Sequence, residues 1–346
     1  MPWNIKECIV ANTDFRTKCC LRKVSTDLRY MAKTSSHHFK SVEIKPVSHV
    51  AVLMTVEDAF GECDMEYFDI DEPVTKAAAD FCLMFQHPNT TVERFVYSKG
   101  TLGQIREIYG PEEEEDEEWE RDVMDARAAF LQAVNQGISR FNHKLNAEEV
   151  ELESYLDEET ILSWLPHFKP NYLKLITIGI DDDTALPQVM QLDQWQQARG
   201  LKVLNVCEIL ELDMGDAYLV NATGPHMDML DIYTLINNLL QEPTNHLKIV
   251  TINDATYERN HLLEALSHFD LILTRNEIFI EMPDLPGFLQ ISSDDVTELV
   301  LAVHTELENE LWPVMEDDGL ENGELIGEED AEKGLDDGEE PEHDDE

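Results

Sequence analysis

The chain has 346 residues, of which 73 are acidic and 25 are Lys or Arg, so its formal net charge is −48. Such a charge repels phosphate backbones and anionic bilayers, which argues against nucleic acid and membrane surfaces as direct partners. No apolar run approaches the roughly 20 residues of a transmembrane helix, and the first residues are too polar for a secretory signal. The 42% hydrophobic content predicts a folded core, in about two domains.

The six cysteines are scattered along the chain, and no two of them form a C-x-x-C pair. In a chain of this length such a pattern is typical of free thiols in a reducing compartment. We therefore expect a cytoplasmic or nuclear protein.

The first 40 residues differ in charge from the rest. They hold eight basic and three acidic residues, a net charge of +5. Such an asymmetry indicates a separate module with an acidic partner.

Two short helices are predicted in this module. Ile5, Cys8 and Ile9 share one helical face, and Asp14 is a good N-cap for a second helix. The second helix carries an apolar stripe made of Leu21, Val24, Leu28 and Met31.

Two segments of the module resemble an F-box. Met1-Pro2-Trp3-Asn4-Ile5-Lys6-Glu7-Cys8-Ile9 contains the apolar-Pro pair with which the motif starts, and Leu21-Arg22-Lys23-Val24-Ser25-Thr26-Asp27-Leu28-Arg29 is similar to its L-R-x-V-S-x-x-L-R helix. F-boxes of this family bind the Skp adaptor of SCF ubiquitin ligases, which is acidic, in agreement with the charge of the module. The resemblance implies an F-box-like module over residues 1–36, with adaptor contacts from Pro2, Trp3, Ile5, Ile9, Leu21, Arg22, Val24 and Leu28. A second interpretation is a helical hairpin that caps the neighbouring domain.

Beyond residue 40, helical and strand-like patterns alternate. In three places an amphipathic helix ends near Pro88, Pro170 or Pro243, and an apolar strand follows within a few residues. A further helix is expected to end at Gly200, a common C-cap position. The expected strands are 92–96, 173–178, 201–206, a short one near 218–220, and 247–252.

This alternation predicts an α/β fold. We expect a largely parallel sheet in a leucine-rich-repeat-like array over residues 37–312, with strands buried on both faces because their apolar runs are nearly continuous. No G-x-G-x-x-G follows any strand, which disfavours a doubly wound nucleotide-binding fold.

Part of this region resembles the FTH domain of nematode F-box proteins. Ile161-Leu162-Ser163-Trp164-Leu165-Pro166 and Lys169-Pro170-Asn171-Tyr172-Leu173 look like the core of that domain, and Leu192-Asp193-Gln194-Trp195-Gln196-Gln197-Ala198-Arg199 is close to its L-E-Q-W-K-Q-A-K signature. The likeness runs from about Ser41 to about Ile291. An F-box followed by an FTH domain is the ordinary arrangement of that family, so the two resemblances support one another.

Two further acidic segments stand out. Residues 111–122 hold nine acidic residues and one Arg. They lead into an amphipathic helix expected from Val123 to Leu145, where acids near the N-terminus suit the helix dipole. Residues 313–346 are strongly acidic with little apolar content, which predicts a disordered tail.

No residue pattern indicates catalysis. Asp181-Asp182-Asp183 follows a strand, but adjacent acids without a nearby His favour a solvated loop over a metal site. His37-His38 lacks the spacing of helix-borne ligands and is interpreted as a pair of exposed linker residues. Trp164 and Trp195 are expected in the core. We therefore expect no cofactor and no metal, and a protein that is not an enzyme.

The sequence thus favours a substrate-recruiting F-box subunit of an SCF-type ubiquitin ligase, in which the Skp-type adaptor and an unknown target protein are the partners. The alternative is an acidic protein-interaction or chaperone-like protein that binds a basic partner without ubiquitin ligase function. An enzyme that uses the acids at 181–183 with a metal is the third and weakest hypothesis.

Overall fold

The computed structural model describes residues 2–68, 71–98, 117–180, 186–204, 210, 212–223, 229–241, 248–253, 259–274, 277–282, 287–292 and 298–305. The chain divides into two compact units, Met1–Leu307 and Glu308–Glu346, and the second lies wholly outside the described residues. The predicted tail at 313–346, the acids at 112–116 and Asp181–Asp183 also lie outside them. Among the described helices, none is both long enough and apolar enough to cross a membrane.

Three short helices begin the chain: α1 (Trp3–Ala11), α2 (Phe15–Val24) and α3 (Thr26–Thr34). Asp14 caps α2 as predicted, because its side chain accepts a hydrogen bond from the Thr17 backbone N–H. The second predicted helix is in fact two helices. Ser25 adopts an extended conformation, and its hydroxyl accepts from the Leu28 N–H at 3.3 Å, which starts α3. Ser25 therefore separates two helices, although the apolar stripe from Leu21 to Met31 continues from one to the other.

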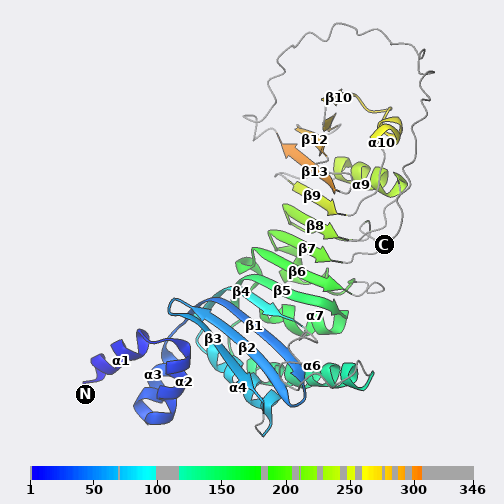
Figure 1. The fold of residues 1–346 in the computed structure, drawn as a ribbon. Coiled ribbons are helices and arrows are strands. Elements are labelled where there is room, and N and C mark those ends of the chain that lie inside the picture. Colours follow the sequence, from blue (N-terminus) through cyan, green and yellow to red (C-terminus); the bar gives the residue numbers. More distant parts are fainter. Residues whose placement is uncertain are drawn as a thin grey trace, which may run out of the picture. The chain divides into compact units, whose positions relative to one another are not determined.

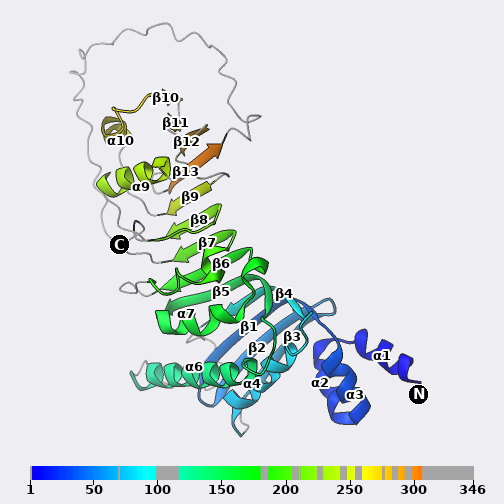
Figure 2. The ribbon, with the colours of Figure 1, turned by 180° about the vertical axis from the view of Figure 1, so that it is seen from behind.

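The rest of the first unit is built on one 13-stranded sheet, in the order β10-β11-β12-β13-β9-β8-β7-β6-β5-β4-β1-β2-β3. Views from opposite sides show the strands following one another in this order, with α1–α3 beside the β1–β3 end (Figures 1 and 2). The strands are β1 (His38–Ser48), β2 (Ala51–Asp58), β3 (Gly61–Tyr67), β4 (Thr91–Tyr97), β5 (Asn146–Leu156), β6 (Leu175–Ile180), β7 (Gly200–Leu204), β8 (Leu219–Thr223), β9 (Lys248–Asn253), β10 (Leu271–Leu273), β11 (Glu277–Glu281), β12 (Gly287–Ser292) and β13 (Glu298–Thr305).

The sheet is only partly parallel, which corrects the prediction of a largely parallel sheet. The pairs from β1 through β4, β5, β6, β7 and β8 to β9 are parallel. The hairpin strands β2 and β3 at one end, and β13 to β10 at the other, are antiparallel. The five strands expected from the alternating pattern all lie in the parallel part, as β4, β6, β7, β8 and β9.

The described helices between the strands are α4 (Pro73–Met84), α6 (Glu117–Ile138), α7 (Glu158–Trp164), α8 (Asp193–Gln196), α9 (Met229–Gln241) and α10 (Arg259–Ala265), with 3-10 turns η1 (Leu165–His167) and η2 (Pro170–Tyr172). The helix expected up to Leu145 ends at Ile138, and Leu145 instead forms a bridge with Phe168. The acidic residues at 117–122 lie in the first turns of α6.

Gly200 does not end a helix, because α8 stops at Gln196 and Gly200 is the first residue of β7. A Cβ atom at Gly200 would lie 3.2 Å from Cδ1 of Leu175 on the neighbouring strand. Close packing between strands, not helix capping, therefore favours glycine at this position.

One face of the sheet forms the core. The register aligns a cross-strand row whose members are all fully buried: Ile44, Tyr97, Leu152, Ile178, Val203, Ala222, Ile252 and Leu299. Buried residues of α4, α6, α7, α9 and α10 belong to the same cluster, so these helices cover this face.

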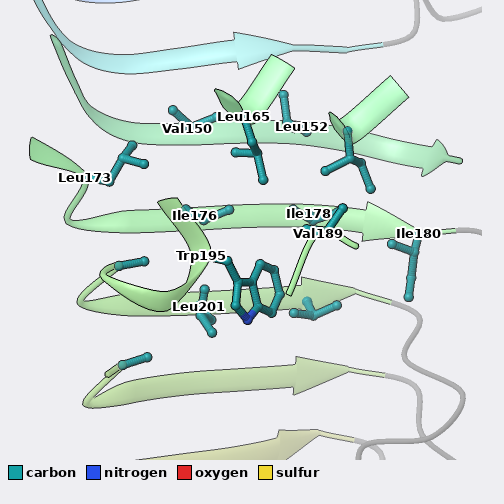
Figure 3. Packing of buried hydrophobic residues seen from close by; sticks show 14 of the residues in the cluster. Val150, Leu152, Leu165, Leu173, Ile176, Ile178, Ile180, Val189, Trp195 and Leu201 are labelled. Atoms are coloured by element: carbon teal, nitrogen blue, oxygen red, sulfur yellow. The ribbon is translucent and has the colours of Figure 1, made fainter. Parts of the chain in front are cut away.

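The two predicted core tryptophans lie in this layer and are fully buried. The Trp164 ring lies between Phe81, Phe95 and Tyr97, with ring centroids 5.0–5.7 Å away. Trp195 packs beside Ile176 and Leu201 of the parallel strands (Figure 3). Both residues are therefore structural, as expected.

The other face is open, which corrects the expectation of burial on both faces. β6 is buried at five of its six residues, but the neighbouring strands expose Arg94 on β4 and Lys202 on β7. Lys202 is aligned with Thr177 and Asn221 in a row that lies between the buried rows. The sheet therefore has helices on one face and a polar surface on the other.

Candidate protein-interaction surface

The module formed by α1–α3 has a small core of its own. Val10 of α1 and Met31 and Ala32 of α3 are buried together, and Leu21 and Leu28 pack against them. Nε of Arg29 also donates to the backbone carbonyl of Arg22 at 3.1 Å, which joins α3 to α2. The three helices therefore form one body.

Four apolar side chains predicted to bind an adaptor lie outside that core. Trp3, Ile5 and Ile9 on α1 are 49%, 46% and 42% exposed, and Val24 at the end of α2 is 70% exposed. Pro2, before α1, is exposed as well. The predicted apolar face of α1 is thus turned to solvent, and its inward residue is Val10.

The other three predicted residues are partly committed to the module. Leu21 and Leu28 are half-buried against its core. Arg22 is half-buried, and its Nε is buried without a hydrogen-bond partner in the described part of the chain. These residues can offer only part of their surface to a partner in the conformation seen.

Tyr30 of α3 extends the same surface and was not predicted. Its side chain is 59% exposed, and its ring centroid lies 6.1 Å from that of Trp3.

A salt bridge also joins α1 to α3. Lys6 and Asp27 form this ion pair at 2.6 Å.

The surface is also positively charged. Arg16, Lys23 and Arg29 are exposed on α2 and α3, while Asp27 is engaged with Lys6. A module with exposed apolar groups and exposed cations suits a partner that offers apolar pockets and acidic groups.

The module is attached to the sheet through Phe15 at the start of α2. Its backbone N–H donates to Oδ2 of Asp58 on β2 at 3.2 Å, and its ring packs edge-on against Phe39 of β1. Oδ1 of Asp58 accepts from the Phe60 N–H at 2.7 Å, so one carboxylate connects the module to the β2–β3 turn.

Lys18 and His37 complete this junction. Lys18 is buried, and its Nζ lies 3.4 Å from Nδ1 of His37. Burial lowers the Lys18 pKa, although Asp58 and Asp14 act in the opposite direction. Burial, then the charge of Lys18, lowers the pKa of His37 to about 3. The imidazole is therefore neutral at physiological pH.

The interpretation of His37 and His38 as exposed linker residues is wrong. The His37 ring is half-buried and stacks on Phe39 at 5.3 Å. His38 is exposed, but it begins β1 and contacts Thr91 and Glu93 of β4 at 2.7 and 2.9 Å. The pairing of β1 with β4 includes His38, and the backbone carbonyl of His37 accepts from the Thr91 N–H at 3.0 Å, so both histidines belong to the fold.

The open face of the sheet is the second large surface. On this face Lys40 pairs with Glu57 at 2.9 Å, and Arg94 pairs with Glu151. Towards β8 and β9 it becomes uncharged, and Asn253 donates to Asn221 at 2.8 Å. The residues that the structure describes contain no cluster of three metal-ligating side chains.

The FTH domain family model matches residues 128–214 of the chain. The match covers the second half of α6, the parallel strands β5 to β7 and the helices between them, and includes both segments that resemble the FTH core. No curated protein and no solved structure matches the chain.

Proposed function

We propose that the protein is a substrate-recruiting F-box subunit of an SCF-type ubiquitin ligase. In this proposal α1–α3 bind the Skp-type adaptor, and the leucine-rich-repeat-like array that includes the FTH match holds a target protein. The chain itself carries out no catalysis, because the other subunits of such a ligase transfer ubiquitin. It acts in the cytoplasm or nucleus.

The observation that carries the proposal is the exposed apolar surface of a basic helical module, in a chain that also matches the FTH domain over residues 128–214. Trp3, Ile5, Ile9, Val24 and Tyr30 all face solvent on three short helices. Large apolar side chains gain about 1.5–3 kcal/mol each when they are fully buried, so such a group favours an interface. FTH domains are linked to F-box proteins, which makes an adaptor the partner that this surface fits.

The test compares two matched variants of the full chain. Val24→Asp places a carboxylate on the proposed interface, opposite an acidic adaptor, and should weaken adaptor binding by about 2–4 kcal/mol. Val50→Asp makes the same change at an exposed position between β1 and β2, outside the module, and should leave binding unchanged.

Affinity for purified adaptor and the melting temperature are measured on all three proteins. Val24 is so exposed that its substitution should leave the melting temperature within about a degree. A wild-type chain that does not bind the adaptor, beside a Val24→Asp variant that loses stability, would contradict the proposal and favour a capping role for the helices.

A further inference from the structure

Strand β3 ends the sheet on the side near the N-terminal module. It pairs with β2 alone among the described strands, from Gly61 opposite Asp58 to Tyr67 opposite Val52. In an antiparallel pair every second residue turns its N–H and C=O away from its neighbour, so a terminal strand offers a row of backbone groups to an added strand.

Three carboxylates follow this edge at every second position. Glu62, Asp64 and Glu66 are exposed, whereas Cys63 and Met65 between them are half-buried. Successive carboxylates are therefore spaced by about 7 Å along the strand, at two residues of extended chain.

In the described part of the chain no salt bridge joins these carboxylates to a cation, although burial raises the pKa of Cys63 between them against an opposing effect of the nearby Arg16 of α2. Asp64 accepts a hydrogen bond from the Thr55 hydroxyl at 2.8 Å, which is a neutral donor. On the adjoining strands the acids are neutralised, as in Lys40–Glu57 at 2.9 Å and Lys45–Glu43 at 2.7 Å. The negative charge of this end of the sheet is thus concentrated on its free edge.

An exposed aromatic side chain lies at each end of the strand. Phe60, before β3, is 61% exposed, and Phe68, after it, is 37% exposed. The hydrogen bond from the Phe60 N–H to Asp58 fixes the turn that carries the first ring. The edge therefore combines backbone groups, a row of acids and two apolar anchors.

We propose that the β3 edge binds an extended basic segment of another protein as an added strand, with Lys or Arg at alternate positions facing Glu62, Asp64 and Glu66. Acids on an edge strand repel a second copy of the same edge, and they repel acidic chains and nucleic acids in general. The edge therefore attracts an extended segment with cations at alternate positions, and it repels a second copy of itself, acidic chains and nucleic acids. Backbone pairing supplies affinity, and the side-chain alternation supplies specificity.

This inference deepens the proposed function, because it names the class of segment by which a target is held. Adaptor binding through α1–α3 does not depend on it. The two proposals can therefore be tested separately. A chain that binds the adaptor but not the peptide contradicts only the inference. A chain that binds the peptide but not the adaptor contradicts only the adaptor role.

The probe is a labelled synthetic peptide that alternates Lys and Val, titrated with the purified full chain and followed by fluorescence anisotropy. The triple reversal Glu62→Lys, Asp64→Lys and Glu66→Lys should weaken binding at least about tenfold, or about 1.4 kcal/mol. The matched control reverses three exposed acids on other elements, Glu159, Asp216 and Glu264, and should bind within about twofold of wild type.

Hydrogen exchange locates the bound peptide. Backbone amides of residues 61–67 should gain protection on binding in wild type and not in the edge variant. An equal loss of peptide affinity in both triple variants would show general attraction to an acidic chain and overturn the inference. Peptide binding without a gain of amide protection at β3 would overturn it as well. Circular dichroism and the melting temperature confirm that both variants are folded, and a Glu-Val peptide should not bind.

Discussion

The carboxylate of Asp58 accepts the backbone N–H of Phe15 at 3.2 Å and that of Phe60 at 2.7 Å, so one side chain of β2 connects the helical module to the sheet. Asp58 is also the largest favourable charge acting on the buried ammonium of Lys18. Phe15 adds its ring to the core beside Phe39. The module is therefore attached by a few buried groups next to the exposed surface that we assign to the adaptor.

Asp58→Ala tests this attachment. The substitution leaves the Phe15 N–H without its acceptor at a buried site and removes the charge that favours the buried Lys18 ammonium, which should lower the free energy of unfolding by about 1–3 kcal/mol. Urea unfolding measures the loss, and hydrogen exchange should show it mainly as faster exchange in α2. Asp58→Asn, which keeps one carbonyl oxygen, should lose less. An Asp58→Ala variant with wild-type stability would show that the module is held by apolar contacts alone.

The two buried tryptophans make a matched pair. Nε1 of Trp195 donates to the backbone carbonyl of Asp213 at 2.6 Å, whereas Nε1 of Trp164 is buried with no partner in the part of the chain that the structure describes. Replacement by Phe removes similar volume at both sites, but only at position 195 does it remove a hydrogen bond. Trp195→Phe should therefore destabilise the protein by about 1 kcal/mol more than Trp164→Phe, as measured by chemical unfolding. Equal losses would mean that Trp164 has an acceptor after all.

A second pair tests the one-sided cover of the sheet. Ile176 is fully buried on β6, and Leu219 on β8 is 40% exposed. Ile176→Ala should cost about 2–5 kcal/mol, because the helices cannot collapse fully into the space left. Leu219→Ala should cost less than about 1 kcal/mol, since water already reaches that side chain. Comparable losses from thermal or urea unfolding would indicate that both faces are covered.

Strands β4, β6 and β9 were predictable because each is a short apolar run that follows a Pro within a few residues, whereas β1 and β5 of the parallel part were not predicted. The open face was not predictable from the sequence, because Lys202 is a single polar residue between the apolar Leu201 and Val203. In the sheet it lies in register with Thr177 and Asn221, and the polar row becomes visible only when strands are aligned.

The antiparallel ends of the sheet had weaker signals. β3 reads Gly-Glu-Cys-Asp-Met-Glu-Tyr, and its turn with β2 contains Ala59 and Phe60 without an Asn-Gly or Asp-Gly pair. Gly61, at φ 121°, carries the unusual backbone conformation of this hairpin. The exposed residues of the candidate site were predicted from family resemblance, because helical periodicity placed Ile5, Cys8 and Ile9 on one face of α1 but did not show that this face is turned to solvent.

The last prediction concerns two thiols. Burial raises the pKa of Cys82, on α4, from its ordinary value of 9.0 to about 11, against a small opposing effect of Arg140. Burial and then Asp80 raise the pKa of Cys19 to a similar value. Cys8 and Cys20 are exposed. An aryl disulfide reagent should therefore modify Cys8 and Cys20 first at pH 8, because the thiolate is the reactive form and these thiols are accessible.

The same shift sets the sign of a pH dependence. Well below pH 9 both thiols are protonated in the folded and unfolded states, so their ionisation does not affect stability. Between about pH 9 and 11 the unfolded chain loses these protons first, and the free energy of unfolding should fall as pH rises. Cys82→Ala should show a smaller fall over this range than wild type, and Cys20→Ala, at an exposed thiol, the same fall as wild type. Urea unfolding at several pH values measures all three slopes. A Cys82→Ala slope equal to that of wild type would mean that the thiol ionises equally well in both states, and that Cys82 is not enclosed between α4 and α6.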